Sequence, residues 1–130
     1  MLNQQTPEEL ELVKDYILLP IMQQMIDKEC SKIEQNRNVL NRMYLTIARL
    51  MLRDIRADFF MNRAEIRKLG IKVVELPESS SVELRYKYIC RGYEYSISMP
   101  RSTVRGEISV RMGRYTGRIE SCLVTTPEKS

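Results

Sequence analysis

The residues best suited to binding another molecule are the basic side chains in the second half of the sequence. From residue 63 onward, thirteen Lys and Arg residues stand against eight Asp and Glu residues, whereas residues 1–62 hold eight basic and nine acidic ones. A guanidinium group donates two parallel hydrogen bonds to a phosphate, so this excess could bind nucleic acid or another polyanion. The candidate polyanion-binding residues are Arg63, Arg67, Lys68, Arg101, Arg105, Arg111, Arg114 and Arg118.

The arginines after residue 100 also allow a purely structural interpretation. If residues 102–115 form a helix, these arginines lie on both sides of its apolar stripe instead of forming a face of their own. Their aliphatic stems would then cover the edge of a core while the guanidinium groups stay in water. The spacing favours this interpretation, and nucleic-acid binding is kept as the alternative function.

Catalytic and metal-binding chemistry has little support in the residue types present. The chain has no histidine, which removes the commonest proton carrier near neutral pH and the commonest metal ligand. Asp54 and Asp58 lie one helical turn apart, but the neighbouring Arg53 and Arg56 indicate an ion-paired surface. The sequence also lacks glycine-rich phosphate-binding loops and the G-x-S-x-G nucleophile motif. We therefore expect no enzymatic activity, no cofactor, and no catalytic, cofactor-binding or metal-binding residues.

The three cysteines, Cys30, Cys90 and Cys122, are widely spaced and include no C-x-x-C pair. An odd, scattered set suits neither a disulfide framework nor a zinc site, so we expect reduced and mostly packed thiols. Cys90 precedes Arg91, which could lower the pKa of its thiol, but Cys90 falls on the apolar face of a predicted strand. Nucleophilic chemistry at Cys90 is therefore not expected.

Length and composition are those of one folded domain. The chain has 130 residues, of which 43% are apolar and 29% charged, enough to bury one core. Residues 1–5 do not resemble a secretory signal, and the apolar stretch over residues 16–26 is too short to span a bilayer. We expect a cytoplasmic protein with no membrane partner. The expected divisions of the single domain, residues 1–130, are a helical part at about 7–69, a hairpin and C-terminal part at about 71–124, and a frayed tail at 125–130.

Two long amphipathic helices are predicted in the first half. Residues 6–9, Thr-Pro-Glu-Glu, have the pattern of a capping box with proline at the first helical position, so a helix begins at about Pro7. Pro20 lies inside this helix and predicts a kink or a restart. A second apolar stripe at helical spacing runs from Leu40 to Ile55, after the polar residues 36–38. We expect an antiparallel helical hairpin, with one continuous bent helix as the alternative.

A third, short helix is predicted from Arg63 to Leu69. Asn62 stands at the position of an N-cap with Glu65 as its partner, and Gly70 suits a helix end. A basic helix followed by strands would allow a winged helix-turn-helix, with the later hairpin as the wing. The predicted helix is short for one that must fill a major groove, so this form of the nucleic-acid hypothesis is not favoured.

The best-specified element is a β-hairpin that follows a predicted strand at residues 71–76. Residues 82–91 and 93–99 alternate apolar and polar side chains on either side of Arg91-Gly92. A two-residue turn at this dipeptide places the apolar residues on one face, and a slip of one residue would mix the two faces. The predicted facing pairs are Cys90/Tyr93, Tyr88/Tyr95, Tyr86/Ile97 and Leu84/Met99.

Four tyrosines share the apolar face of this hairpin. They could stack on RNA bases, as the aromatic residues of sheet-based RNA binders do. The same alternation is required of a sheet that packs one face on helices, and we favour this core interpretation. The four residues are Tyr86, Tyr88, Tyr93 and Tyr95.

The segment before the polar tail is compatible with a helix or a strand. Apolar residues recur at helical spacing from Val104 to Ile119, whereas Ile108, Val110 and Met112 also alternate as in a strand. Three glycines in this segment would each cost a helix interior about 1 kcal/mol relative to alanine. We favour a helix over residues 102–115.

The predicted helices of the first half are apolar on more than one side. Such helices contact more than one neighbour, and with a single small sheet in the chain a second subunit could be that neighbour. Eight methionines supply adaptable side chains that suit protein-binding surfaces. The candidate oligomer-interface residues are Leu12, Tyr16, Leu19, Met43 and Leu50.

These observations predict an α+β fold. Its expected parts are a long N-terminal helical hairpin, a short helix, a small antiparallel sheet containing a two-residue-turn β-hairpin, and a C-terminal helix. We expect a non-catalytic cytosolic binding or regulatory protein that acts through contacts with another protein or with itself, as a homodimer. The alternative is a nucleic-acid-binding regulator that uses the basic second half.

Overall fold

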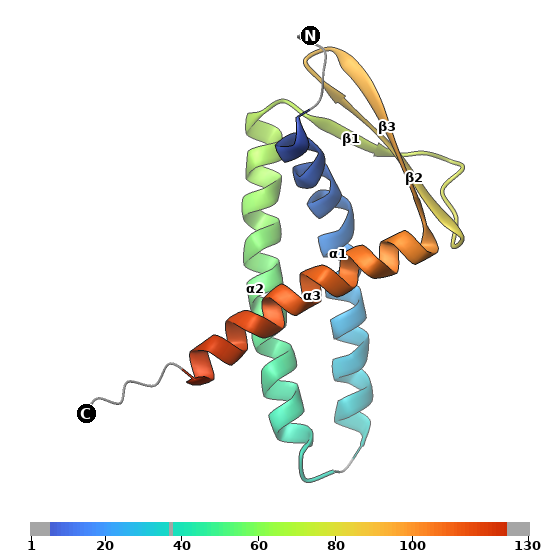
Figure 1. Cartoon of the computed structure of the whole chain (residues 1–130). Coiled ribbons are helices and arrows are strands. Elements are labelled where there is room, and N and C mark those ends of the chain that lie inside the picture. The colour runs from blue at the N-terminus through green and yellow to red at the C-terminus, as the bar shows by residue number, and fades with distance from the viewer. Residues whose placement is uncertain (1–5, 37, 125–130) are drawn as a thin grey trace, which may run out of the picture.

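The computed structural model describes residues 6–36 and 38–124 and has the predicted α+β architecture. Two long antiparallel helices form a hairpin, a three-stranded sheet covers one end of it, and the last helix crosses it (Figure 1). The elements are α1 (Pro7–Gln35), α2 (Asn41–Lys68), β1 (Lys72–Glu75), β2 (Glu83–Cys90), β3 (Tyr93–Pro100) and α3 (Arg101–Val124).

Helix α1 begins at the predicted capping box. The Thr6 hydroxyl accepts a hydrogen bond from the backbone N–H of Glu9, and the Glu9 carboxylate accepts one from the backbone N–H of Thr6. The helix then continues through Pro20 to Gln35, so the restart allowed at this proline does not occur. Packing of buried residues on both sides of Pro20, such as Ile17, Leu19 and Met22, offsets the lost backbone hydrogen bond.

The two long helices form a hairpin, as predicted, and the alternative of one continuous helix is wrong. The connection is short and polar: the Asn38 side chain accepts a hydrogen bond from the Leu40 backbone N–H, and the Asn41 side chain donates one to the Ile33 carbonyl. Residue 37 lies outside the described residues. These two side chains satisfy a carbonyl group in the last turn of α1 and the backbone N–H of Leu40 before α2, where the chain reverses.

The predicted short helix at residues 63–69 is wrong, because α2 runs without interruption to Lys68. Asn62 is not an N-cap. Its side chain is 6% exposed, and its amide nitrogen donates a 2.9 Å hydrogen bond across the hairpin to the carbonyl of Leu12. The end at Gly70 is as predicted, with a left-handed φ of 71°. Asn62 therefore makes a contact between α2 and α1 instead of capping a helix.

The sheet has the strand order β1-β2-β3, and both pairings are antiparallel. All four predicted facing pairs of the β-hairpin are confirmed. Arg91 and Gly92 have φ values of 55° and 80°, the left-handed conformations that a two-residue turn of this hand requires. The predicted apolar face is turned inward, where Tyr88, Cys90 and Ile97 are buried. Arg85 and Ser98 lie on the outer, exposed face.

Helix α3 confirms the favoured interpretation of the C-terminal segment and is longer than predicted, reaching Val124. It crosses the helical hairpin (Figure 1) and buries Ile108, Arg111, Tyr115 and Ile119. These residues are three or four positions apart, so a helix presents them on one side whereas a strand would divide them between two faces. Burial of this stripe outweighs the unfavourable helix propensity of the glycines.

Replacing Gly106 or Gly113 by alanine is expected to stabilise the protein by up to about 1 kcal/mol each, because alanine loses less backbone entropy in a helix. Apart from its chain neighbours and the backbone of its own helix, a Cβ atom at either position would meet no described atom within 4 Å. The free energy of unfolding from urea titrations tests this. Gly92→Ala is the contrasting variant, since its φ of 80° should make that substitution destabilising.

All three helices and the two long strands contribute to one buried core. Its most enclosed side chains include Val13, Leu18, Met22, Ile55 and Tyr88. The predicted frayed tail, residues 125–130, lies outside the described residues. Among the helices described, none combines the length and the hydropathy needed to cross a membrane.

Candidate functional site

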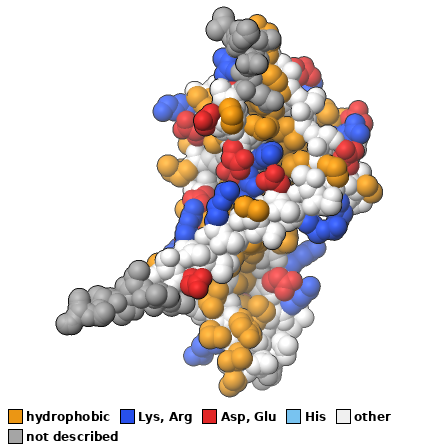
Figure 2. Space-filling model, viewed as in Figure 1, with side chains coloured by type: hydrophobic (Ala, Val, Ile, Leu, Met, Phe, Trp, Pro, Cys, Tyr) orange, Lys and Arg blue, Asp and Glu red, His pale blue; other side chains and the backbone are white. Residues whose placement is uncertain are grey.

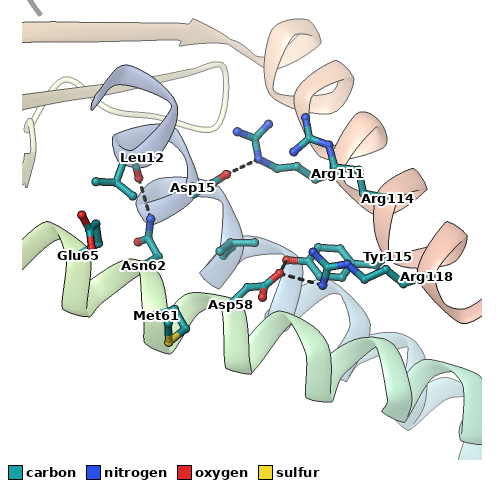
Figure 3. A pocket seen from close by; sticks show the side chains of 11 residues that line it. Leu12, Asp15, Asp58, Met61, Asn62, Glu65, Arg111, Arg114, Tyr115 and Arg118 are labelled. Carbon is teal, nitrogen blue, oxygen red and sulfur yellow. Dashed lines mark hydrogen bonds and ion pairs between the residues drawn. The ribbon is translucent and has the colours of Figure 1, made fainter. Parts of the chain in front are cut away.

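The crossing of α3 over α1 and α2 creates a polar pocket of about 370 Å³, which we call the helix junction (Figure 3). Each of the three helices supplies side chains to it. The lining residues are Leu12, Asp15, Leu19, Asp58, Met61, Asn62, Glu65, Arg111, Arg114, Tyr115 and Arg118.

Arg111 is the most deeply buried charged side chain described, with 2% of its surface exposed. Its guanidinium group donates hydrogen bonds of 2.8 Å to Asp15, 2.7 Å to Glu107 and 2.5 Å to Glu11. Lys14 forms a further ion pair with Glu107 at 3.3 Å. Two helices therefore enclose one cation with three carboxylates, an arrangement that satisfies the donors of a buried guanidinium group.

A second polar contact lies one turn further along α3. The Tyr115 hydroxyl donates a 2.7 Å hydrogen bond to Asp58, and Arg118 pairs with the same carboxylate at 3.1 Å (Figure 3). The Arg118 guanidinium carbon lies 4.7 Å from the centre of the Tyr115 ring. Burial, together with the hydrogen bond to Asp58, raises the pKa of Tyr115, so its hydroxyl stays protonated as a donor.

Among the described residues, three groups of the junction have no hydrogen-bond or ion-pair partner: Asn62 Oδ1, Arg114 and the exposed Glu65 carboxylate. Asn62 Oδ1 is buried without a donor, although the amide nitrogen of the same side chain is bonded. Arg114 is exposed and lines the pocket, and it forms no ion pair within residues 6–36 and 38–124. The hydrogen bonds and ion pairs of the junction join α3 to α1 and α2.

Acid is expected to weaken the helix junction. The hydrogen bond from Arg111 and the contact with Lys14 hold the pKa of Glu107 below its usual value. A carboxyl with a lowered folded-state pKa stabilises the fold fully above its unfolded pKa, and this stabilisation is lost as the pH falls through the folded value. The free energy of unfolding should therefore decrease as the pH is lowered below about 4.5. The Glu107→Gln variant should show a shallower decrease, and an identical pH dependence in both proteins would contradict the prediction.

The structure does not bring the eight candidate polyanion-binding residues together. Arg63, Arg67 and Lys68 lie at the end of α2. The chain then enters the sheet at the end of its strands where Lys72 faces Ile89. Arg101 and Arg105 begin α3 at the other end of the same strands, where Glu83 faces Pro100. An eight-residue strand separates the two groups by roughly 25 Å.

The remaining three candidates belong to the helix junction. Arg111 is buried and ion-paired, and Arg118 contacts Asp58 and Tyr115, whereas Arg114 lines the pocket and is exposed. In addition, a winged helix-turn-helix needs a separate short recognition helix, but residues 63–68 are the last turns of α2. The eight residues therefore do not form one basic surface.

The five candidate interface residues separate into two groups. In α1, Leu19 is buried in the core, and Leu12 and Tyr16 are half-buried against it. In α2, Met43 is exposed and Leu50 is half-buried. The first group therefore packs against the core of the chain, and Met43 is the exposed member of the set.

Met43 and Leu50 belong to a larger apolar surface that we call the distal apolar face. Figure 2 shows hydrophobic side chains gathered on the part of the helical hairpin that extends beyond α3. Three of its side chains are strongly exposed: Leu40 at 44%, Met43 at 49% and Tyr44 at 46%. The distal apolar face consists of Leu40, Met43, Tyr44, Ile47 and Leu50.

Comparison with the models of known protein families gives a match. The model of the YhjD protein family matches residues 4–120. The chain belongs to the YhjD protein family. No curated protein and no solved structure matches it. The region matched by the YhjD family includes the helix junction, the distal apolar face and the whole sheet.

In this YhjD family member, the four hairpin tyrosines differ in exposure. Tyr88 is fully buried and stacks on Tyr95, with ring centres 5.2 Å apart. Tyr86 and Tyr95 are half-buried against the core, and Tyr93 is 46% exposed. The inner face of the sheet is therefore covered by α1 and α3, which leaves no row of open rings for bases to stack on.

The cysteines of this YhjD family member form no disulfide. Cys90 is buried. Its burial, and to a smaller extent the negative charge of Glu9 nearby, raise the pKa of its thiol, whereas an activated nucleophilic cysteine has a lowered pKa. Glu9 also binds the Arg91 guanidinium group, which joins the start of α1 to the hairpin turn. Among the described residues, no group of three or more His, Cys, Asp or Glu residues could hold a metal ion.

The acidic partners of Arg111 are not evident from the sequence. One signal was present, since Glu107 and Arg111 are four residues apart on a predicted helix and so can pair. Glu11 and Asp15 have the same spacing on α1, but the sequence does not show that α3 crosses at this turn. Only the packing of the helices reveals the cluster.

Proposed function

We propose that this protein is a non-catalytic binding protein that associates with a second copy of itself through the distal apolar face. The supporting observation is that Leu40, Met43 and Tyr44 are exposed together on the part of the helical hairpin that extends beyond α3. A contiguous exposed apolar patch marks a binding surface more often than isolated apolar residues do. Three free thiols suit a reducing compartment, which supports a cytoplasmic location.

A second hairpin is a suitable occupant for this surface because of its shape. The members of the distal apolar face recur every three or four residues along α2, the spacing of a helix-packing seam. Two such hairpins facing each other about a two-fold axis would bury both seams as a four-helix bundle.

The charges of the distal helices are largely paired within the chain. Arg49 pairs with Glu34 and Arg56 with Asp27 across the hairpin, while Arg53 pairs with Asp54 and Lys32 with Glu29. Exposed ion pairs of this kind contribute little, so the proposed contact rests on the apolar seam and not on charge complementarity.

The Met43→Glu variant tests the proposal. Size-exclusion chromatography with light scattering should give a dimer for the unaltered protein and a monomer for Met43→Glu, with at least about a tenfold increase in the dimer dissociation constant. Val110→Glu is the matched control, because Val110 is 57% exposed on α3 and lies outside the distal apolar face. Circular dichroism should show that both variants remain helical. A monomer for the unaltered protein at all concentrations, or equal dissociation in both variants, would refute the proposal.

A further inference from the structure

A second pocket lies on the side of α1 that faces the start of α3, and we call it the apolar groove. Its volume is about 830 Å³, and its walls come from α1, the segment leading into β2, and the first three turns of α3. The apolar lining residues are Ile21, Met25, Val82, Leu84, Val104, Ile108 and Met112. Clefts of this size with mostly apolar walls are typical of sites for small organic ligands.

The acidic residue at the groove has hydrogen-bond partners, whereas the two arginines there have no acidic partner among the described residues. Glu83 is occupied, since it accepts hydrogen bonds from Arg85 and Ser98. Arg101 donates a hydrogen bond to the Ser81 carbonyl but has no acidic partner among the described residues. Arg105 is exposed and forms no ion pair within the described part of the chain. The groove therefore has a net positive opening.

The placement of these arginines is unfavourable for helix stability alone. Arg101 and Arg105 stand at the beginning of α3, and its first turn contains no acidic residue. Positive charge at this end of a helix opposes the helix dipole, which favours carboxylates there. A departure from a local rule is commonly found at a functional site. An anion bound between the arginines would relieve this repulsion.

From these features we infer that the apolar groove binds a single-chain amphiphile with an anionic head, of the long-chain carboxylate class. The alkyl chain would lie against Val104, Ile108 and Met112, which share one side of α3, and the carboxylate would be held by Arg105 with Arg101 beside it. The alkyl chain accounts for the apolar walls, and the carboxylate accounts for the arginines without acidic partners. A wholly apolar ligand would leave those charges unexplained.

The test uses three probes with the same ten-carbon chain, each below its critical micelle concentration: decanoate, decanol and decyltrimethylammonium. Methyl NMR spectra should show saturable shifts at Ile108 and Met25 with decanoate. Binding of decanol should be at least about tenfold weaker, and decyltrimethylammonium weaker still, because only decanoate pairs with the arginines. Equal binding of the three probes, or none by decanoate, would refute the inference.

Variants at the groove separate the carboxylate contact from the apolar contact. Arg105→Gln should weaken decanoate binding about tenfold and leave decanol binding unchanged. Ser109→Trp places a large side chain at the groove and should abolish binding of both, whereas Val110→Trp, at the next residue and outside the lining, should not. Equal loss in both tryptophan variants would contradict the site.

Two further measurements separate the groove from the proposed dimer contact and from a membrane surface. Met43→Glu should bind decanoate as well as the unaltered protein does, because Met43 lies outside the groove. The inference would therefore stand even if the dimer proposal failed. Sedimentation with anionic phospholipid vesicles should not deplete the protein from solution. Binding to vesicles without binding of monomeric decanoate would mean that the groove contacts a membrane surface, and would overturn the inference.

Discussion

Replacing Arg111 by alanine is expected to destabilise the protein by about 3 kcal/mol, the lower part of the range for breaking a buried ion pair. The loss is large because Arg111 is 2% exposed and binds Glu11, Asp15 and Glu107. Without the guanidinium group, these carboxylates repel one another across the α1–α3 contact. They retain partial exposure to water, which limits the effect. Urea titration at neutral pH measures the change.

Two matched variants identify the cause of this loss. Arg111→Met keeps most of the packing volume but not the charge. Relative to Arg111→Ala, it should therefore recover only the part of the unfolding free energy that the cavity costs. Arg114→Ala removes an exposed arginine of the same helix and should change the free energy of unfolding by less than about 0.5 kcal/mol. If Arg111→Ala cost less than about 1 kcal/mol, Arg111 would behave as a surface ion pair and the buried clamp would be disproved.

Replacing Tyr88 by serine is expected to destabilise the protein by about 3–5 kcal/mol, the range for removing a large buried side chain. Tyr88 is 0% exposed, and its ring stacks on that of Tyr95. Serine would leave a cavity between the sheet and α1 and would remove the ring contact. A folded Tyr88→Ser protein with nearly unchanged stability would contradict the core position of this residue.

Tyr88→Phe is the matched control and separates the ring from the hydroxyl group. The Tyr88 hydroxyl is buried without a hydrogen-bond partner among the described residues. Burial raises the pKa of Tyr88 to about 12, so the group is neutral at physiological pH. Removing an unsatisfied buried hydroxyl removes its desolvation penalty, so Tyr88→Phe should be neutral or slightly stabilising. A clear loss of stability in this variant would indicate that the hydroxyl has a partner in solution.

The β-hairpin was predictable in detail because its determinants are local. Alternation of apolar and polar residues sets which face is inward, and Arg91-Gly92 permits the tight turn, so the register follows from a few neighbouring residues. The start of α1 was predictable for the same reason, since the capping box of Thr6 and Glu9 is complete within four residues.

Asn62 illustrates where local signals fail. Its residue type and its distance from Glu65 are those of an N-cap, yet it lies inside α2 and binds the backbone of Leu12, fifty residues earlier. A side chain that can cap a helix can equally donate a hydrogen bond across a helix pair. Which contact forms depends on what packs opposite, and that information is not carried by the neighbouring residues.

The sequence by itself determined the α+β class, the helical hairpin, the strand register and the absence of histidine chemistry, because periodicity, turn residues and composition are properties of short segments. Only the tertiary structure decided that Arg111 is a buried clamp, that Leu19 packs inside while Met43 is exposed, and that the basic residues are separated. The burial of Arg111 depends on the place where α3 crosses α1 and α2. That crossing is set by packing between segments about 100 residues apart, which no local pattern encodes.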